Sequence, residues 1–301
     1  MAAHHPHDHK AHMENIRELF SSDFARTYNE RTGGCNILLA NHLISLVKPH
    51  LPSPSSASQL RILDSACGPL VLSTQCMKDD SIMQQYPSVH ISAVDLSEDF
   101  IKHSQQIIDS TPAWNSDGKT IDTAVMNGMD LKFLDNTFDV AFTSLAIFAY
   151  PDPIKCAKEL LRTLKPGGVA ALTTWKRVGW VPLLHEVEAL VRPGQELSKF
   201  PFLEPWQVPG KLEQTLTDGG LQDVVESDVL AYAWFDNEEK AAKSLSDTLK
   251  LLVGSEWEEA EKERMSDGFK QVMASESKYV MRGEGGKVGF EMVAWTGVGK
   301  K

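Results

Sequence analysis

Short apolar segments alternate with amphipathic helical patterns between residues 60 and 175, and this alternation limits the fold more than any other feature of the chain. Apolar segments of this length, separated by helices, are typical of parallel strands whose two faces are both covered. We therefore predict a doubly wound sheet in this region. The segments expected to form its strands are Leu60–Asp64, Val89–Asp95, Ile121–Met126, Phe138–Thr143 and Val169–Trp175.

The flanking segments extend this pattern. Two helical patterns lie between Met13 and Val47, and Gly33-Gly34 separates them. After Trp175 we expect four helices and two further strands, near 221–235 and 288–298. The predicted class is α/β, with a doubly wound, mostly parallel seven-stranded Rossmann-like sheet, N-terminal helices and a helical cap after strand five. The expected divisions are a disordered histidine-rich tail (1–12), a helical lid (13–50), a ligand-binding core (60–175) and a cap with the last two strands (176–301).

Composition excludes several classes of function. Lys and Arg number 30 and Asp and Glu 41, so the net charge is −11, which argues against a nucleic-acid partner. The four cysteines form no C-x-x-C pair, so neither a zinc ribbon nor a disulfide framework is predicted. No apolar segment could cross a bilayer and no signal peptide is recognisable, so we expect a cytoplasmic protein with no membrane partner. Five of the ten histidines lie in residues 1–12, where we expect a solvated tail and no metal site.

In a doubly wound sheet, ligands bind beyond the carboxyl ends of the strands. The first strand leads into the small-residue turn of RILDSACGPL, which lets the backbone approach a ligand. Both the dinucleotide pattern G-x-G-x-x-G and the phosphate loop G-x-x-x-x-G-K-[ST] are missing there, which disfavours a nicotinamide dehydrogenase. Asp95 closes the second strand, where an acid can accept both hydroxyls of a ribose. A helix cap is the alternative role, but Ser97 already serves it.

Four motifs occur in order: RILDSACGPL, AVDLSEDFI, NGMDLKFLDNTFDVAFTSLAIF and ELLRTLKPGGVAALTTW. Together they resemble the motif set of class I S-adenosylmethionine-dependent methyltransferases over about residues 60–175. The segments YNERTGG, TTWKRVGWVPLL and AWTGVGKK also resemble fungal methyltransferases of natural-product metabolism. That group includes enzymes that S-methylate the dithiol form of epidithiodiketopiperazines.

The resemblance implies S-adenosylmethionine as cofactor, S-adenosylhomocysteine as product, and a row of cofactor-binding residues along these loops. They are Asp64, Ala66, Cys67 and Gly68 at the methionine part, Asp95 at the ribose, Leu96, Asn127, Gly128 and Met129 around the adenine, Ser144 and Leu145 at the sulfonium, and Tyr28 closing over it. Cys67 is expected to pack in the loop and not to act as a nucleophile.

One position departs from the family pattern. Where the family has three glycines at alternate positions, this chain has Ala66, Gly68 and Leu70. Leu70 adds bulk where the next helix begins, and we expect it to move the loop and weaken cofactor binding.

The acceptor pocket is expected to use aromatic side chains from the regions around the core. These are Phe148, Trp175, Trp180, Phe200, Phe202 and Trp206. Alternatively, the same residues form the core of the cap. Candidate general bases are His185 and Tyr28. A thiol ionises partly unaided, while a phenol gains more from a base, so the need for one depends on the acceptor.

These features predict methyl transfer to an oxygen, nitrogen or sulfur atom of a small secondary metabolite by in-line displacement, with sulfur slightly favoured. Two alternatives stay open. One is a methyltransferase-like protein that binds the cofactor but catalyses another natural-product reaction. The other is a regulatory binding protein without catalysis. The sequence allows either a monomer or a homodimer.

Overall fold

The computed structural model describes residues 22–54, 59–253, 257–275 and 277–301. The expected histidine-rich tail, residues 1–12, and the start of the first predicted helix lie outside these residues. The chain divides into two compact units. The first, here called the helical unit, takes the described part of residues 1–35 with residues 177–201 and 230–293. The second, the sheet unit, takes residues 36–176, 202–229 and 294–301.

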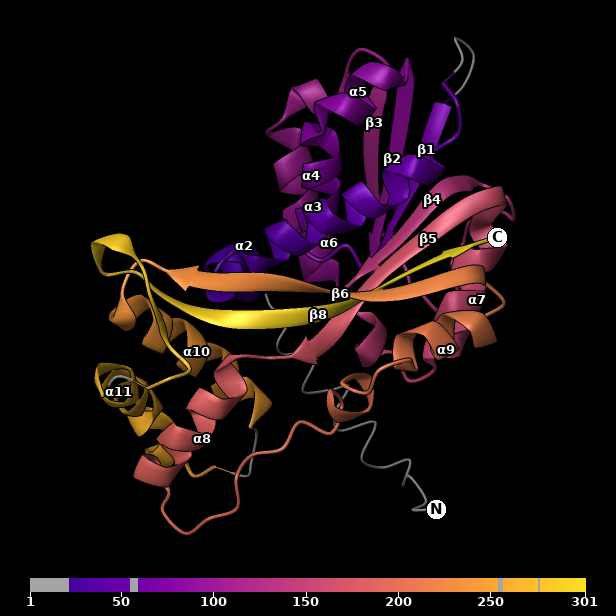
Figure 1. Ribbon diagram of the computed structural model, residues 1–301. Helices are drawn as coiled ribbons and strands as arrows, with labels where there is room; N and C mark the ends of the chain where they lie inside the picture. Colours follow the sequence, from indigo (N-terminus) through magenta and orange to yellow (C-terminus); the bar gives the residue numbers. More distant parts are fainter. Residues whose placement is uncertain (1–21, 55–58, 254–256, 276) are drawn as a thin grey trace. The chain divides into compact units, whose positions relative to one another are not determined.

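Strands and helices alternate through the sheet unit (Figure 1). In chain order its elements are α3 (Cys35–Val47), η1 (Lys48–His50), β1 (Gln59–Ser65), α4 (Val71–Lys78), α5 (Asp80–Gln85), β2 (Ser88–Asp95), α6 (Glu98–Asp109), η2 (Pro112–Asn115), β3 (Lys119–Val125), β4 (Phe138–Ser144), η3 (Ile147–Ala149), α7 (Pro153–Thr163), β5 (Leu164–Arg177), η4 (Glu204–Trp206) and α9 (Lys211–Asp218). Two long strands, β6 (Gln222–Phe235) and β8 (Val288–Lys300), contribute residues to both units.

The strand order is β3-β2-β1-β4-β5-β8-β6. Strands β1 to β5 pair in parallel, so their carboxyl ends meet at one edge. The chain runs outward from β1 to β3 and then returns to β4, so the strand order reverses between β1 and β4. The register aligns Ser65 with Val94 and Asp95 with Val125 at this edge. The predicted doubly wound, mostly parallel α/β fold is confirmed.

Over the described residues the sheet has eight strands and not the predicted seven. The additional strand is β7 (Met281–Arg282), which pairs antiparallel with β8. Between them lies η6 (Glu284–Gly286), where Gly285 and Gly286 take left-handed backbone angles that glycine adopts without steric cost. A two-residue strand carries no periodic pattern, so the sequence did not reveal it.

Helix boundaries in the sheet unit follow from capping side chains. Ser97 accepts a hydrogen bond from Phe100 N at 3.3 Å and begins α6, as predicted. Asp152 caps α7 through Lys155 N at 2.9 Å. The helical segment that follows β1 divides at Asp79, whose carboxylate caps a second helix, α5.

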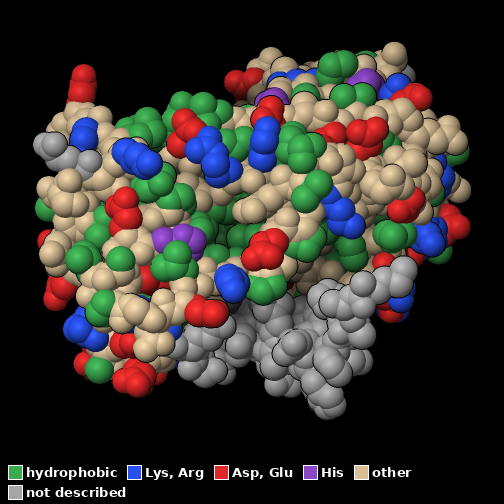
Figure 2. All heavy atoms as spheres, turned by 60° about the horizontal axis from the view of Figure 1, so that its bottom comes forward, with side chains coloured by type: hydrophobic (Ala, Val, Ile, Leu, Met, Phe, Trp, Pro, Cys, Tyr) green, Lys and Arg blue, Asp and Glu red, His purple; other side chains and the backbone are tan. Residues whose placement is uncertain are grey.

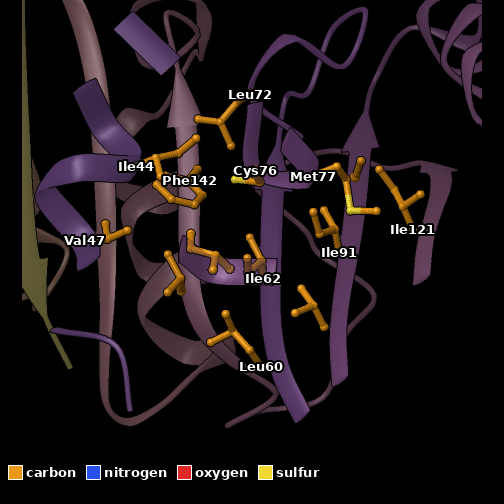
Figure 3. Close-up of a cluster of buried hydrophobic side chains, with 14 of the residues drawn as sticks. Ile44, Val47, Leu60, Ile62, Leu72, Cys76, Met77, Ile91, Ile121 and Phe142 are labelled. Atoms are coloured by element: carbon orange, nitrogen blue, oxygen red, sulfur yellow. The ribbon is translucent and has the colours of Figure 1, made fainter. Parts of the chain in front are cut away.

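Two hydrophobic clusters cover the two faces of the sheet. One joins side chains of β1, β2 and β4 to α3, α4, α5 and α6, and part of it is drawn in Figure 3. The other joins α7 and α9 to the opposite face and includes Trp206 and Trp295. The central strands β1, β2, β4 and β5 therefore bury side chains on both faces, which explains why they read as nearly continuous apolar segments.

The helical unit contains α2 (Ser22–Arg31), α8 (Trp180–Val191), α10 (Glu238–Leu252) and α11 (Glu259–Ala274). Helix α11 packs against both α8 and α10 (Figure 1). The segment that follows α8 is hydrogen-bonded to that helix. The carboxylate of buried Glu188 accepts a hydrogen bond from Ser198 N at 2.9 Å. Among the described residues, no helix is both long and apolar enough to cross a membrane.

Candidate active site

The turn after β1 has an unusual backbone. Ala66, Gly68 and Leu70 all take positive φ angles, of 60°, 51° and 61°. Hydrogen bonds hold the turn, because Cys67 N donates to Val94 O at 3.0 Å and Leu70 N donates to Cys67 O at 3.1 Å. No atom lies within 4 Å of the position that a Cβ on Gly68 would occupy. The turn therefore presents backbone to open space at the carboxyl edge of the sheet.

Leu70 turns its side chain away from this space. It is fully buried and belongs to the hydrophobic cluster shared with α3 and α4. Its backbone keeps the left-handed conformation, which costs a residue other than glycine about 1–2 kcal/mol. The Leu70 side chain therefore packs in the hydrophobic core and does not occupy the space beside the turn.

Asp95, at the end of β2, joins two turns. Its Oδ2 accepts a hydrogen bond from Gly68 N and its Oδ1 accepts one from Ser97 N, each at 2.9 Å. Burial raises the pKa of Asp95, and the backbone donors oppose this rise by stabilising the carboxylate. Each oxygen keeps a further lone pair, so the carboxylate can still accept two hydroxyl donors.

Asp64, at the end of β1, is a second buried acid. Its Oδ2 accepts hydrogen bonds from Ser73 N at 3.1 Å and Ser73 Oγ at 2.6 Å, whereas its Oδ1 is buried without a partner. Burial raises the pKa of Asp64 to about 6, against the effect of the two Ser73 donors. The unsatisfied oxygen is an acceptor that the protein itself leaves open.

The ends of β2 and β3 expose apolar side chains next to Asp95. Leu96 is 45% exposed and Val125 is 49% exposed. In the loop after β3, Asn127 Oδ1 accepts a hydrogen bond from Met129 N at 2.9 Å, and Asp130 N donates to Asn127 O at 2.8 Å. These bonds fold the loop tightly around Gly128.

The end of β4 is held by β5. Leu145 has a φ of 53°, and its N donates to Thr173 Oγ1 at 2.9 Å. Ser144 Oγ lies 3.3 Å from the same hydroxyl oxygen. Thr173 therefore fixes the direction in which the chain leaves β4.

Of the predicted acceptor-pocket aromatics, four belong to the sheet unit. The rings of Phe148 and Phe202 lie 6.1 Å apart, and Trp175 is partly buried on β5. Trp206 is only 5% exposed and packs with α9 in the cluster against the sheet, whereas the alternative prediction placed it in the core of the cap.

The remaining candidates belong to the helical unit. Trp180 and Phe200 make an edge-to-face contact with centroids 5.6 Å apart. Tyr28 packs edge-on against Phe24 at 5.6 Å. His185 Nε2 lies 3.1 Å from Ser198 O, and because a carbonyl only accepts, Nε2 carries the proton in this contact. Nδ1 is therefore the nitrogen of His185 that could act as a base.

Metal and thiolate chemistry have little support in the described part of the chain. No group of three or more His, Cys, Asp or Glu side chains there could hold a metal ion. Burial raises the pKa of the Cys67 thiol well above its ordinary value, and the nearby acids add to the rise. The Cys67 thiol is therefore protonated near neutral pH.

Comparison with known families gives a match over the strands and loops described above. Residues 63–172 match the family model described as a methyltransferase domain. This part of the chain is therefore similar to the methyltransferase domain, the domain of S-adenosylmethionine-dependent methyltransferases. The match begins in β1 and ends in β5, so it contains all four strand ends described above. S-adenosylmethionine is the cofactor of this class, in agreement with the prediction from sequence.

Curated relatives share only part of the chain. Methyltransferase tpcH of Aspergillus fumigatus is 29% identical over 136 residues, which cover 45% of this chain and 46% of that protein. A demethylmenaquinone methyltransferase of Listeria welshimeri is 29% identical over 128 residues, covering 39% and 49%. The chain spans less than half the length of these relatives, so the similarity concerns the domain.

Solved structures share the fold over more of the chain. Protein YcgJ of Bacillus subtilis matches with a TM-score of 0.51 and 13% identity, covering 87% of this chain and 98% of that one. Protein BH2331 of Bacillus halodurans gives a TM-score of 0.50 at 16% identity, with the same coverage of 87% and 98%. At sequence identities this low, the comparison shows a shared fold.

The residues at these strand ends fit the chemistry of S-adenosylmethionine. Asp95 can accept the ribose hydroxyls, the exposed side chains of Leu96 and Val125 offer an apolar surface to adenine, and the unpartnered Asp64 Oδ1 can accept from an ammonium group. The open space at Gly68 leaves room for the methionine part.

Sequence reasoning missed several residues that build this site. Val125 ends a predicted strand, and its exposure depends on how far the neighbouring loops extend. Ser73 and Thr173 act through hydrogen bonds to residues on other elements. Tyr150 lies against Gly128 and carries no motif. Only the strand-end position of Val125 offered a usable signal.

Proposed function

We propose that this protein transfers the methyl group of S-adenosylmethionine to an oxygen, nitrogen or sulfur atom of a small secondary metabolite. The pair formed by Asp95 and Gly68 N–H carries the proposal, because it joins the turns after β1 and β2 and holds the carboxylate proposed to accept the ribose hydroxyls. The cofactor residues in this proposal are those predicted from sequence, with Val125 added.

The bound cofactor supplies a methyl group on a sulfonium, which makes the transfer an in-line displacement. The protein must hold the acceptor atom near the methyl carbon and exclude water. Thr173 serves this purpose by fixing the backbone of Ser144 and Leu145, which we propose line the sulfonium. His185 through Nδ1, and Tyr28, are the proposed bases for acceptors that need one.

An apolar, aromatic acceptor is part of the proposal. Phe148, Phe202 and Trp175 are its proposed contacts within the sheet unit, and Trp180 and Phe200 are candidate contacts within the helical unit. On the face in Figure 2, basic side chains are scattered among acidic and apolar ones. This distribution, with the net charge of −11, supports a small-molecule acceptor over a nucleic acid.

A cytoplasmic setting also belongs to the proposal. Cys67, Cys76 and Cys156 are buried free thiols, which is the usual state in a reducing compartment. We propose a monomer or a homodimer.

Thermal unfolding with excess ligand tests the cofactor. S-adenosylmethionine and S-adenosylhomocysteine at 100 times their dissociation constants should each stabilise the protein by about 2.7 kcal/mol. Each kcal/mol raises the midpoint by roughly 2–4 °C for a chain of this size. NAD is the control and should produce no rise. If neither adenosyl compound raises the midpoint, the proposal is wrong.

Acceptor panels test the transfer. Purified protein, S-adenosylmethionine and sets of aromatic thiols, phenols and amines are incubated, and S-adenosylhomocysteine is quantified. We expect product with at least one set. Cofactor binding without product in any set, or in metabolite extracts, would instead favour a protein that uses the cofactor for another reaction.

A further inference from the structure

The side chain of Tyr150 lies against two loops of the proposed cofactor site, the loop after β1 and the loop after β3. A Cβ on Gly128 would overlap the hydroxyl of Tyr150 and would lie 2.8 Å from its Cζ and 3.1 Å from Ser65 Oγ. Gly128 does not have a positive φ, so its backbone conformation would accept alanine. Tyr150 itself therefore excludes a side chain at position 128.

The strand order explains why such a contact matters. Strand β2 lies between β1 and β3, so no strand pairing links the end of β1 directly to the end of β3. Ser65 is the last residue of β1, and Gly128 follows β3. Tyr150 comes from the loop after β4, on the other side of β1, and reaches both.

The hydroxyl of Tyr150 is held in a neutral state. Burial raises the pKa of Tyr150 well above its ordinary value, and the nearby Asp95 carboxylate adds to the rise, while the Ser65 hydroxyl opposes it. Ser65 beside it is fully buried, and its Oγ has no aligned hydrogen-bond partner. Tyr150 is therefore a protonated spacer between the loops and cannot serve as a base.

We propose that Tyr150 is a positioning residue that sets the separation of the β1 and β3 loops and thereby the affinity for the adenosyl cofactor. The inference rests on the proposed function, because the methionine part and the adenine of one ligand must reach these two loops at once. A change in their separation would move one contact relative to the other.

A double-mutant cycle with S-adenosylhomocysteine tests this role. Dissociation constants are measured by calorimetry for the wild type, Gly128→Ala, Tyr150→Leu and the double variant. We expect each single change to weaken binding by about tenfold, within the range of coupling between contacting residues. In the double variant the alanine occupies space left by the phenol, so binding should weaken no further than in Tyr150→Leu.

Gly219→Ala is the matched control. Its Cβ would overlap Ala157 Cβ on α7, and its φ of −72° is ordinary, so it imposes a similar clash elsewhere in the sheet unit. This variant should lower the melting midpoint and leave the dissociation constant within about twofold of the wild type. A purely structural role for Tyr150 predicts the same behaviour for its variants.

Three results would overturn the inference. Multiplicative effects in the double variant mean that the two residues act independently. Unchanged affinity in folded Tyr150→Leu, with a wild type that binds, removes the positioning role and leaves the proposed function intact. A wild type that binds neither adenosyl compound removes both. If Tyr150→Leu does not fold, Tyr150→Phe replaces it in the cycle, and its loss of the overlapping hydroxyl should relieve part of the Gly128→Ala defect.

Discussion

Ser73 donates two hydrogen bonds to one oxygen of Asp64, from its backbone N at 3.1 Å and from its hydroxyl at 2.6 Å. The other carboxyl oxygen is buried without a partner. Because only one of its two oxygens accepts hydrogen bonds, the charged form of Asp64 is poorly stabilised in the absence of ligand. Burial consequently raises the pKa of Asp64 from 3.8 to about 6.

The contribution of Asp64 to the free energy of unfolding should fall as pH rises from about 4 to about 6. In this window the folded protein keeps a proton on Asp64 that the unfolded chain has released, and stability falls with pH wherever the folded state binds more protons. The rise in pKa corresponds to a loss on the order of 3 kcal/mol above pH 6. Asp64→Asn should remove this slope, and urea titrations at several pH values measure the difference between the two proteins.

Ser73→Ala is the companion variant. It removes the hydroxyl donor, so the pKa of Asp64 should rise further and the falling limb should extend above pH 6. Identical slopes for wild type and Asp64→Asn would show that Asp64 titrates like an exposed carboxyl and would contradict the prediction.

Asp95→Ala should lose most of its affinity for S-adenosylhomocysteine. Hydrogen bonds to a charged partner contribute about 1.5–3 kcal/mol each, so losing two ribose contacts predicts a decrease of at least 100-fold. Stability should also fall, because Gly68 N–H and Ser97 N–H lose their acceptor. Calorimetry and urea unfolding measure the two effects separately.

Ser97→Ala distinguishes ribose binding from helix capping at this turn. It removes the cap on Phe100 N and should cost about 1 kcal/mol of stability without changing ligand affinity. Equal losses of affinity in Asp95→Ala and Ser97→Ala would mean that Asp95 acts only by ordering the turn.

Leu70→Gly should destabilise the protein without improving the cofactor site. Removing a fully buried leucine costs about 2–5 kcal/mol, and relief of the left-handed backbone returns about 1–2 kcal/mol. The dissociation constant for S-adenosylhomocysteine should stay within about threefold, since the side chain points into the core. Clearly tighter binding by Leu70→Gly would show that leucine obstructs the site after all.

The sequence predicted most of the sheet because its signals are local. The apolar segment expected at 89–95 is β2 (Ser88–Asp95), and Ser97 caps α6 as its position before Glu98 and Asp99 indicated. Parallel strands buried on both faces leave this apolar pattern in the sequence. The start of β5 was missed, since Leu164 pairs with Phe138 across an irregular register that Pro166 and the following glycines conceal.

The site was harder to predict where the role of a residue depends on the direction in which its side chain points. The family pattern identified Leu70 as unusual, but only the packed structure shows its side chain in the core. Trp206 is an aromatic residue of the kind that lines ligand pockets, but its side chain is buried like that of a core residue. Tyr150 and Gly128 lie on separate loops, and their contact depends on how those loops fold. The assignment of individual residues to cofactor and acceptor stays a prediction.

Gly33 and Gly34 provide a last test, on the helical unit. Both have positive φ, of 58° and 71°. A Cβ on Gly33 would lie 2.7 Å from Trp234 N, whereas nothing lies within 4 Å of one on Gly34. Trp234 N also donates to Gly33 O at 2.9 Å, so this turn is joined to β6 by its backbone.

Gly34→Ala should therefore cost only the left-handed conformation, about 1–2 kcal/mol. Gly33→Ala adds a backbone clash and strains the bond to Trp234, so it should cost at least about 2 kcal/mol more. Urea unfolding of the two variants gives this difference directly, with each glycine as the control for the other. Equal destabilisation would mean that the turn can move off β6 at little cost, because a clash with backbone atoms is relieved only by moving one of the two segments.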